Sequence, residues 1–97
     1  MLLRELLDIS EIRDERGSMD HPVEGLACDS RRVRDGYVFF ALAGQHADGH
    51  NFVDEAVTRG AVAVVVQRPV LAPSPAAYVR VPSTRRAMAH ALSLIHI

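Results

Sequence analysis

The sequence predicts an α/β sandwich in which a mixed sheet of about four strands has helices packed on it. Segments with helical periodicity alternate with short apolar segments, in the order helix, strand, strand, helix, strand, strand, helix. One of the short segments, residues 61–66 (AVAVVV), is an uninterrupted run of alanine and valine. Such a run is typical of a strand that is covered on both faces.

The composition favours one small globular domain. The chain has 97 residues, of which 48% are hydrophobic and 24% charged, a balance that excludes a disordered or fibrous chain. The net charge is −1, and the arginines within residues 31–34 are too few for a nucleic-acid face. Cys28 is the only cysteine, so an intrachain disulfide is excluded. We find neither a membrane helix nor a secretory signal, and we expect a cytoplasmic protein with no membrane partner.

The first half of the chain contains one predicted helix and two predicted strands. Four leucines within residues 2–7 lie at helical spacing and predict a short amphipathic helix. Residues 10–22 are polar and predict a connector, after which residues 23–28 alternate loosely and predict a strand. Residues 29–36 are charged and predict a turn. Residues 37–42 are apolar and aromatic, and their brevity predicts a buried strand.

The second half repeats this pattern. A polar loop over residues 44–50 precedes a helix, for which Asn51 is the expected N-cap and Gly60 the expected left-handed C-terminal residue. After strand 61–66 and a loop with three prolines, residues 77–81 predict the last strand. Ser83 is the expected N-cap of the final helix.

Residues 25–66 carry the most specific pattern of the chain. It consists of an apolar strand, D-S-R-x-V-x-x-G, a second apolar strand, G-x-x-x-D-G-H-x-F, a helix, and G-A-x-A-x-V-V. Each piece is weakly specific, but their order and spacing together resemble the N-terminal domain of the Mur ligases, in particular of the members that extend the muramyl peptide beyond the dipeptide. Tyr37 and Val38 depart from this pattern, which has Asp-Leu there, and we expect the change to alter only the turn.

The resemblance implies that residues 1–91 are a domain that binds the UDP moiety of a muramyl-peptide substrate. The parent would be an ATP-dependent ligase of peptidoglycan synthesis that adds meso-diaminopimelate or L-lysine, as the third amino acid, to UDP-N-acetylmuramoyl-L-alanyl-D-glutamate. Implied substrate-binding residues are those that match the family's UDP contacts, namely Cys28, Ser30, Gln45, His46 and Ala47. The family varies at Cys28 and at the pair Gln45 and His46, so backbone contacts are expected there.

The chemistry of these residues suits a nucleoside diphosphate. The hydroxyl of Ser30 follows a strand and can form hydrogen bonds with ribose or phosphate oxygens. Two glycines allow the second loop to approach a ligand closely, and backbone N–H groups can bind phosphate without a lysine. Supporting residues expected in the same two loops are Asp29, Arg31, Gly44, Asp48, Gly49 and His50.

Structural roles compete with these binding roles. Asp29 is expected to cap its turn, and Arg31 to pair with a nearby carboxylate as readily as with a phosphate. His50 is expected to orient its loop or cap the helix, and Cys28 to be a small buried apolar group. The histidines and the aspartate within residues 46–50 lack a further ligand at zinc spacing, so no metal site is predicted.

The chain has no phosphate-binding loop of the form G-x-x-x-x-G-K-[ST]. The resemblance therefore implies that ATP and Mg2+ serve the parent enzyme only, that this chain holds no catalytic residue, and that it forms no product by itself. We expect a monomer whose partner is UDP-N-acetylmuramoyl-dipeptide.

Three other hypotheses stay open. One is the related ligase that adds D-alanyl-D-alanine, although the leucine-rich opening favours the tripeptide enzyme. The others are a stand-alone nucleotide-binding module and an α/β interaction domain without a ligand. Residues 92–97 (LSLIHI) match, in translation, a transposase adapter used in sequencing libraries, and we expect them to be non-native.

Overall fold

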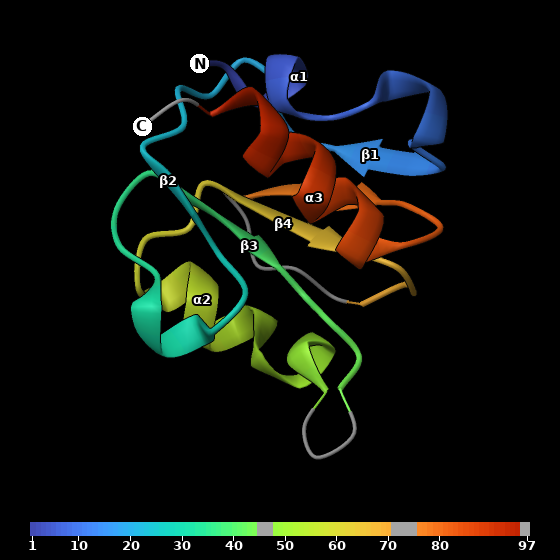
Figure 1. The fold of residues 1–97 in the computed structure, drawn as a ribbon. Helices are drawn as coiled ribbons and strands as arrows, with labels where there is room; N and C mark the ends of the chain where they lie inside the picture. Colours follow the sequence, from blue (N-terminus) through green and yellow to red (C-terminus); the bar gives the residue numbers. More distant parts are fainter. Residues whose placement is uncertain (45–47, 71–75, 96–97) are drawn as a thin grey trace.

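The computed structural model describes residues 1–44, 48–70 and 76–95. Within them, five strands form one mixed sheet in the order β1-β5-β4-β3-β2 (Figure 1). The strands are β1 (Asp14–Arg16), β2 (Gly25–Ala27), β3 (Tyr37–Phe40), β4 (Ala63–Val66) and β5 (Ala77–Arg80). Strands β2 to β5 pair in parallel, whereas β1 pairs antiparallel with β5. The predicted α/β class is confirmed, with one strand more than expected.

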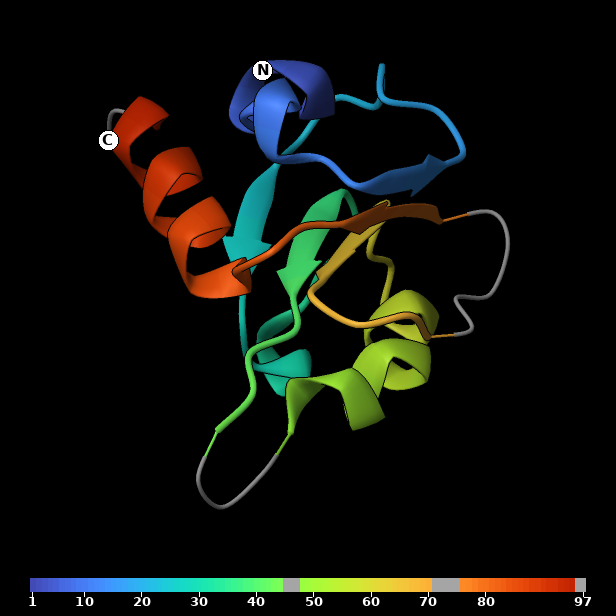
Figure 2. The ribbon, with the colours of Figure 1, turned by 90° about the vertical axis from the view of Figure 1, so that its right-hand side faces the viewer.

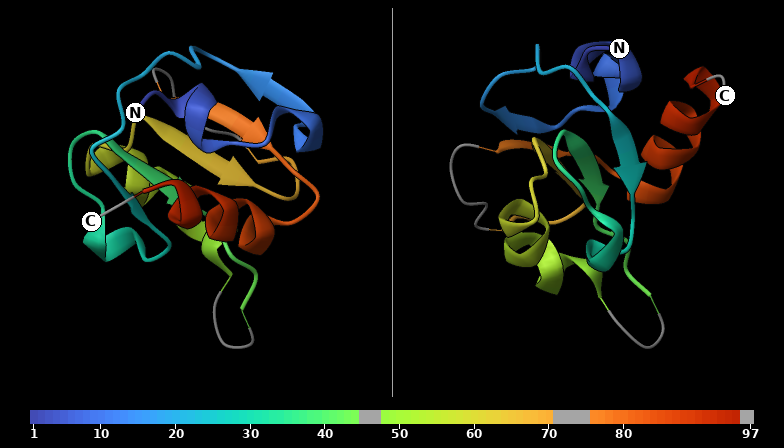
Figure 3. Two further views of the ribbon diagram at one scale, coloured as in Figure 1. Left: turned by 45° about the horizontal axis from the view of Figure 1, so that its top comes forward. Right: turned by 90° about the vertical axis from the view of Figure 1, so that its left-hand side faces the viewer.

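Helices cover both faces of the sheet, as Figures 2 and 3 show. Their bounds are α1 (Leu3–Leu6), α2 (Val53–Thr58) and α3 (Thr84–Leu94), with 3-10 turns η1 (Ile9–Glu11), η2 (Ser30–Arg32) and η3 (Gly49–Phe52). Helices α1 and α3 pack on one face, while α2 packs on the other together with η2 and η3. Of the described helices, none has the length and apolar character needed to cross a membrane.

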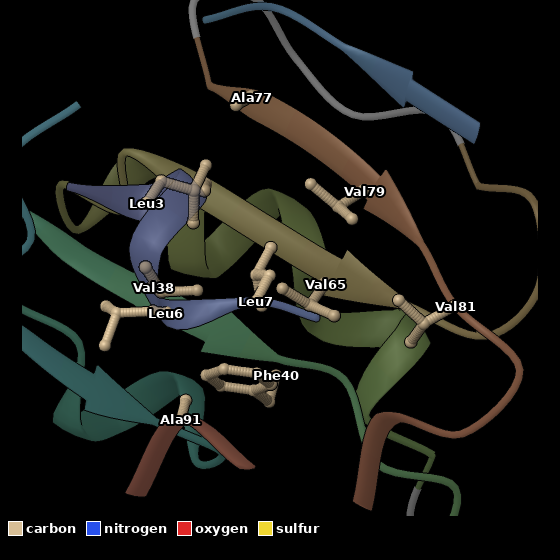
Figure 4. Close-up of a cluster of buried hydrophobic side chains, with 11 residues drawn as sticks. Leu3, Leu6, Leu7, Val38, Phe40, Val65, Ala77, Val79, Val81 and Ala91 are labelled. Carbon is tan, nitrogen blue, oxygen red and sulfur yellow. The ribbon is translucent and has the colours of Figure 1, made fainter. Parts of the chain in front are cut away.

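The core is divided into two clusters by the alternation of side chains along each strand. In β3, Val38 and Phe40 point to the α1 and α3 side, whereas Phe39 points to the α2 side. In β4, all four side chains are fully buried, which confirms the prediction of a strand covered on both faces. Figure 4 shows the first cluster, where Leu3 and Leu6 of α1 meet Phe40 and its neighbours from β4 and β5.

Strand β1 was predicted as part of a connector, and that prediction is wrong for its three residues. All three residues are charged and exposed, so no apolar alternation marks the strand in the sequence. Backbone pairing with β5 forms the strand instead, and the Arg16 guanidinium lies 4.4 Å from the centroid of the Tyr78 ring. Charged side chains on this edge oppose pairing with another chain.

The predicted caps are confirmed at two positions and wrong at one. Gly60 follows α2 with a φ of 113°, and Ser83 caps α3 by accepting a hydrogen bond from a backbone N–H. Asn51 is not the N-cap, because the 3-10 turn η3 precedes α2. The side chain of Asp48 caps that turn by accepting a hydrogen bond from the backbone N–H of His50 at 3.0 Å.

A partly buried chain of hydrogen bonds joins the segments that follow β3 and β4 to the start of α3. The His50 side chain is buried, and its Nδ1 lies 2.7 Å from Asp48 Oδ1. Its Nε2 accepts from the backbone N–H of Gln67 at 3.0 Å, so the ring proton lies on Nδ1. Gln67 Oε1 in turn accepts from the backbone N–H and the hydroxyl of Thr84, each at 3.1 Å. His50 therefore orients its loop, as predicted.

Asp48 carries a lowered pKa within this chain of hydrogen bonds. The backbone N–H of His50 donates to the carboxylate and, with the His50 ring and Arg68, lowers the pKa of Asp48 from 3.8 to about 2. A carboxylate with a lowered folded-state pKa stabilises the fold at pH above its unfolded value, and this stabilisation is lost as the pH falls through its folded value.

We expect Phe40→Ala to lower the free energy of unfolding by about 3–5 kcal/mol, because the ring fills the core between α3 and the sheet. Phe52→Ala removes the same atoms from a ring that is 40% exposed and is the matched control, with a clearly smaller loss. Urea denaturation followed by circular dichroism measures both. Equal losses would contradict the assignment of Phe40 to the core.

We expect His50→Ala to lower the free energy of unfolding by about 2–3 kcal/mol, because it leaves the Asp48 carboxylate and the Gln67 N–H without their buried partner. His90→Ala, at an exposed position of α3, is the matched control and should be nearly neutral. Amide hydrogen exchange should also show faster exchange at Gln67 in the first variant alone. Unchanged exchange at Gln67 would show that the hydrogen bond does not form.

We expect Asp48→Asn to flatten the acid branch of the stability curve. In the unmodified chain, stability should fall as the pH drops from about 4 to about 2, the window between the ordinary and the lowered pKa of Asp48. The amide cannot titrate, so the variant should be less stable than the unmodified chain at neutral pH. It should also lose less stability between pH values of about 4 and about 2. Denaturation at a series of pH values tests this, and two parallel curves would rule out the assigned contribution.

Candidate functional site

A pocket of about 620 Å3 opens where the chain leaves β2 and β3. Because β2 and β3 are parallel neighbours, their carboxyl ends lie at the same end of the sheet, which is the usual ligand site of α/β folds. Its size lies within the range of small-molecule sites. Residues from both strand ends, from η3 and from two helices line it: Cys28, Asp29, Ser30, Arg31, Phe39, Leu42, Gly44, Gly49, Phe52, Glu55 and Arg85.

The pocket brings together most of the described residues that the sequence singled out. The segment from Cys28 to Arg31 forms one wall, and Gly44 and Gly49 belong to the same lining. Gln45, His46 and Ala47 lie outside the described residues. Two further residues, Asp48 and His50, do not line the pocket and instead belong to the partly buried chain of hydrogen bonds.

The loop after β3 is closed at its base beside the pocket. Ala43 and Asp48 form an antiparallel bridge, and the N–H of Gly49 donates to the carbonyl of Leu42 at 2.8 Å. A Cβ on Gly49 would lie 2.7 Å from the backbone nitrogen of Leu42. Gly49 is therefore required by the close approach of its own chain, in addition to any approach of a ligand.

Ser30 is almost fully buried, at 6% exposure, and its hydroxyl already has a partner. Its Oγ lies 2.8 Å from Glu55 Oε2 in α2, a residue 25 positions later in the chain. An ionised carboxylate only accepts hydrogen bonds, so the serine hydroxyl is the donor. We expected this hydroxyl to form hydrogen bonds with a ligand. In the structure its proton is donated to Glu55, so only the lone pairs of the Ser30 oxygen remain available to a ligand.

Asp29 and Arg31 form a pair on the rim of the pocket. Asp29 accepts from the Arg31 backbone N–H at 3.0 Å and from the guanidinium at 3.1 and 2.8 Å. The hydrogen bonds from the Arg31 guanidinium, followed by the one from its backbone N–H, lower the pKa of Asp29 from 3.8 to about 2. The expected turn cap at Asp29 and the pairing of Arg31 with a carboxylate are both confirmed.

Cys28 is exposed, and the prediction of a buried apolar cysteine is wrong. Strand β2 ends at Ala27, which is the residue that packs into the core on the α2 side. Cys28 follows the end of the strand and does not belong to this core. It lines the pocket, where a ligand could reach it.

Sequence reasoning missed five side chains of the pocket, of which Phe39 and Leu42 come from β3 and the segment after it. Phe52 belongs to the G-x-x-x-D-G-H-x-F pattern but was not assigned a contact, and Glu55 lies one helical turn further along the chain. That spacing is the signal that could have found Glu55. Arg85 comes from the first turn of α3, and no local pattern relates it to the two loops.

A second hollow, of about 120 Å3, lies between η1 and α3, and it is too small for a nucleotide. Its charged lining residues are Asp8, Glu11 and Arg86. Over residues 1–44, 48–70 and 76–95, no group of three or more His, Cys, Asp or Glu side chains is placed to hold a metal ion.

Curated sequences support the family that the site pattern indicates. A UDP-N-acetylmuramoyl-L-alanyl-D-glutamate–2,6-diaminopimelate ligase of Geobacter sulfurreducens is 41% identical over 96 residues, which are 99% of this chain and 19% of the relative. The enzyme of the same name from Aquifex aeolicus is 48% identical over 68% of this chain and 13% of its own length. This chain thus spans a fifth or less of the length of these relatives.

Solved structures agree on the fold. MurF from Acinetobacter baumannii superposes with a TM-score of 0.62 at 34% identity, over 70% of this chain and 15% of that one. MurF ligase from Thermotoga maritima in complex with ADP gives 0.62 at 33% identity, over 72% and 16%. The profile described as "Mur ligase family, catalytic domain" matches residues 22–96. With these matches and the ordered loop pattern, the chain belongs to the Mur ligase family.

Proposed function

We propose that this chain is the substrate-anchoring domain of a ligase that adds 2,6-diaminopimelate to UDP-N-acetylmuramoyl-L-alanyl-D-glutamate, and that its pocket binds the UDP moiety. The observation that carries the proposal is the meeting of the Cys28–Arg31 segment with the base of the Gly44–Gly49 loop around one pocket. The relatives that match 99% of the chain are named for this amino acid, which favours it over L-lysine.

The charges of the lining suit a nucleoside diphosphate. Two arginines and two carboxylates line the pocket, and Arg31 is already paired with Asp29. Arg85 forms no ion pair with any residue that the structure describes, and its side chain is exposed at the pocket. We therefore assign the diphosphate to the Arg85 side. Phe52, whose ring is partly exposed in the lining, offers an apolar surface to the uracil.

The pocket contributes to catalysis by positioning alone. Holding the UDP end of the substrate fixes where the distant peptide carboxylate lies, which lowers the entropic part of the barrier for its reaction. No phosphate loop is present in the chain, so ATP and Mg2+ belong to the part of the parent enzyme outside these residues. Binding of UDP-N-acetylmuramoyl-dipeptide by a cytoplasmic monomer is part of this proposal.

A D-alanyl-D-alanine-adding ligase is the second candidate, and one observation favours it. Solved structures that superpose on this chain include MurF enzymes, at 33–34% identity over 70–72% of the chain, and a D-alanyl-D-alanyl ligase of Acinetobacter baumannii. Two curated diaminopimelate ligases reach 40–41% over 99% of it, so the tripeptide enzyme remains the better proposal. Activity of the parent enzyme with each muramyl peptide decides between the two.

We expect the 97-residue chain to bind UDP weakly and saturably. In a titration followed by 15N–1H correlation spectra, shifts should concentrate at residues 28–31 and 49–55. Arg85→Ala should weaken binding about tenfold, because it removes a charge-assisted contact to phosphate. Arg86→Ala, the next arginine of α3 but outside this pocket, is the matched control. A chain that stays indifferent to UDP through the millimolar range would disprove the proposed function.

A further inference from the structure

The Ser30 and Glu55 pair is a fixed acceptor site inside the pocket. Glu55 reaches Ser30 from α2, and both residues belong to the lining. The other carboxylate oxygen of Glu55 accepts from Arg59 Nε at 3.2 Å, so the side chain is held from two sides. Two residues from distant parts of the chain thus present a preorganised group to whatever enters the pocket.

The hydrogen-bonding roles of Ser30 and Glu55 determine what this pair can bind. The carboxylate of Glu55 accepts and cannot donate, and the hydroxyl proton of Ser30 is directed to it. Both residues therefore offer only lone pairs to a ligand. A phosphate at neutral pH also offers acceptor oxygens and carries negative charge, so it is repelled from Glu55. The partner of this pair must be a group that donates hydrogen bonds.

A uridine nucleotide carries donors of two kinds. The ribose has two neighbouring hydroxyls, whereas the uracil ring has a single N–H. Two adjacent acceptors, an unused lone pair of Ser30 and the free lone pairs of Glu55, match the two hydroxyls of the ribose. An acidic side chain that accepts from the ribose 2′-hydroxyl is also the device that dinucleotide-binding folds use.

We propose that Glu55, acting with Ser30, binds the ribose hydroxyls of the nucleotide, so that the pocket selects ribonucleotides over 2′-deoxyribonucleotides. This inference rests on the proposed UDP site and specifies its orientation. The ribose lies at Ser30 and Glu55, the base lies near Phe52 one helical turn away, and the diphosphate lies towards Arg85. Glu55 is then a specificity-determining residue, while its bond to Ser30 sets the direction of the serine proton.

The test compares UDP with 2′-deoxy-UDP on the 97-residue chain. The unmodified chain should bind UDP about tenfold more tightly, because the deoxy ligand leaves a charged acceptor without its donor. Glu55→Ala should bring the two dissociation constants together, mainly by weakening UDP. Asp54→Ala, at an exposed neighbouring position of α2 outside the lining, is the matched control and should keep the preference. Circular dichroism verifies that each variant is folded.

Glu55→Gln is the second variant, because it keeps the length and one acceptor oxygen while removing the charge. It should retain part of the preference. If Glu55 only ties η2 to α2, its loss would weaken both ligands equally and leave the ratio unchanged, which overturns the inference. Equal affinity of the unmodified chain for the two nucleotides would also overturn it, while the UDP site would stand. Absence of any UDP binding would remove both.

Discussion

The parallel pairing of β2 with β3 is the constraint on which the pocket depends. It aligns Ala27 with Phe39, so the loops that follow both strands leave the sheet at the same end. Gly25 leaves room for the ring of Tyr37 on the neighbouring strand, because a Cβ on Gly25 would lie 2.6 Å from that ring. A slip of one residue would turn the core side chains of β2 to the other face and separate the two loops.

Burial of His50 adds a second constraint, since it ties the loop after β3 to two other segments. Its ring bonds Asp48 on one side and the backbone after β4 on the other, and Gln67 continues the chain to Thr84 at the start of α3. Arg85 is the next residue of that helix and lines the pocket. The hydrogen bonds that hold Asp48 and His50 thus also position the cation assigned to the diphosphate.

The pocket separates donors from acceptors in a way that residue types alone do not reveal. A serine after a strand can donate or accept, and its role depends on the group that takes its proton. Glu55 takes it, so Ser30 and Glu55 both offer only acceptors to the pocket. Arg85 is the lining arginine left for an anion, since Arg31 is already bound by Asp29. A nucleoside diphosphate carries groups complementary to both, namely hydroxyl donors and anionic oxygens.

The amino-acid sequence by itself determined the features that depend on neighbours a few residues apart: the buried strand β4 within residues 61–66, the left-handed Gly60, the Ser83 cap and the ordered loop pattern of the Mur ligases. Only the tertiary structure decided the features that depend on distant contacts. Strand β1 exists because β5 offers its edge, Cys28 is exposed because β2 ends before it, and the proton of Ser30 points inward because α2 places a carboxylate beside it. Local periodicity reflects the burial of a face, whereas a hydrogen-bond partner 25 residues away leaves no trace in it.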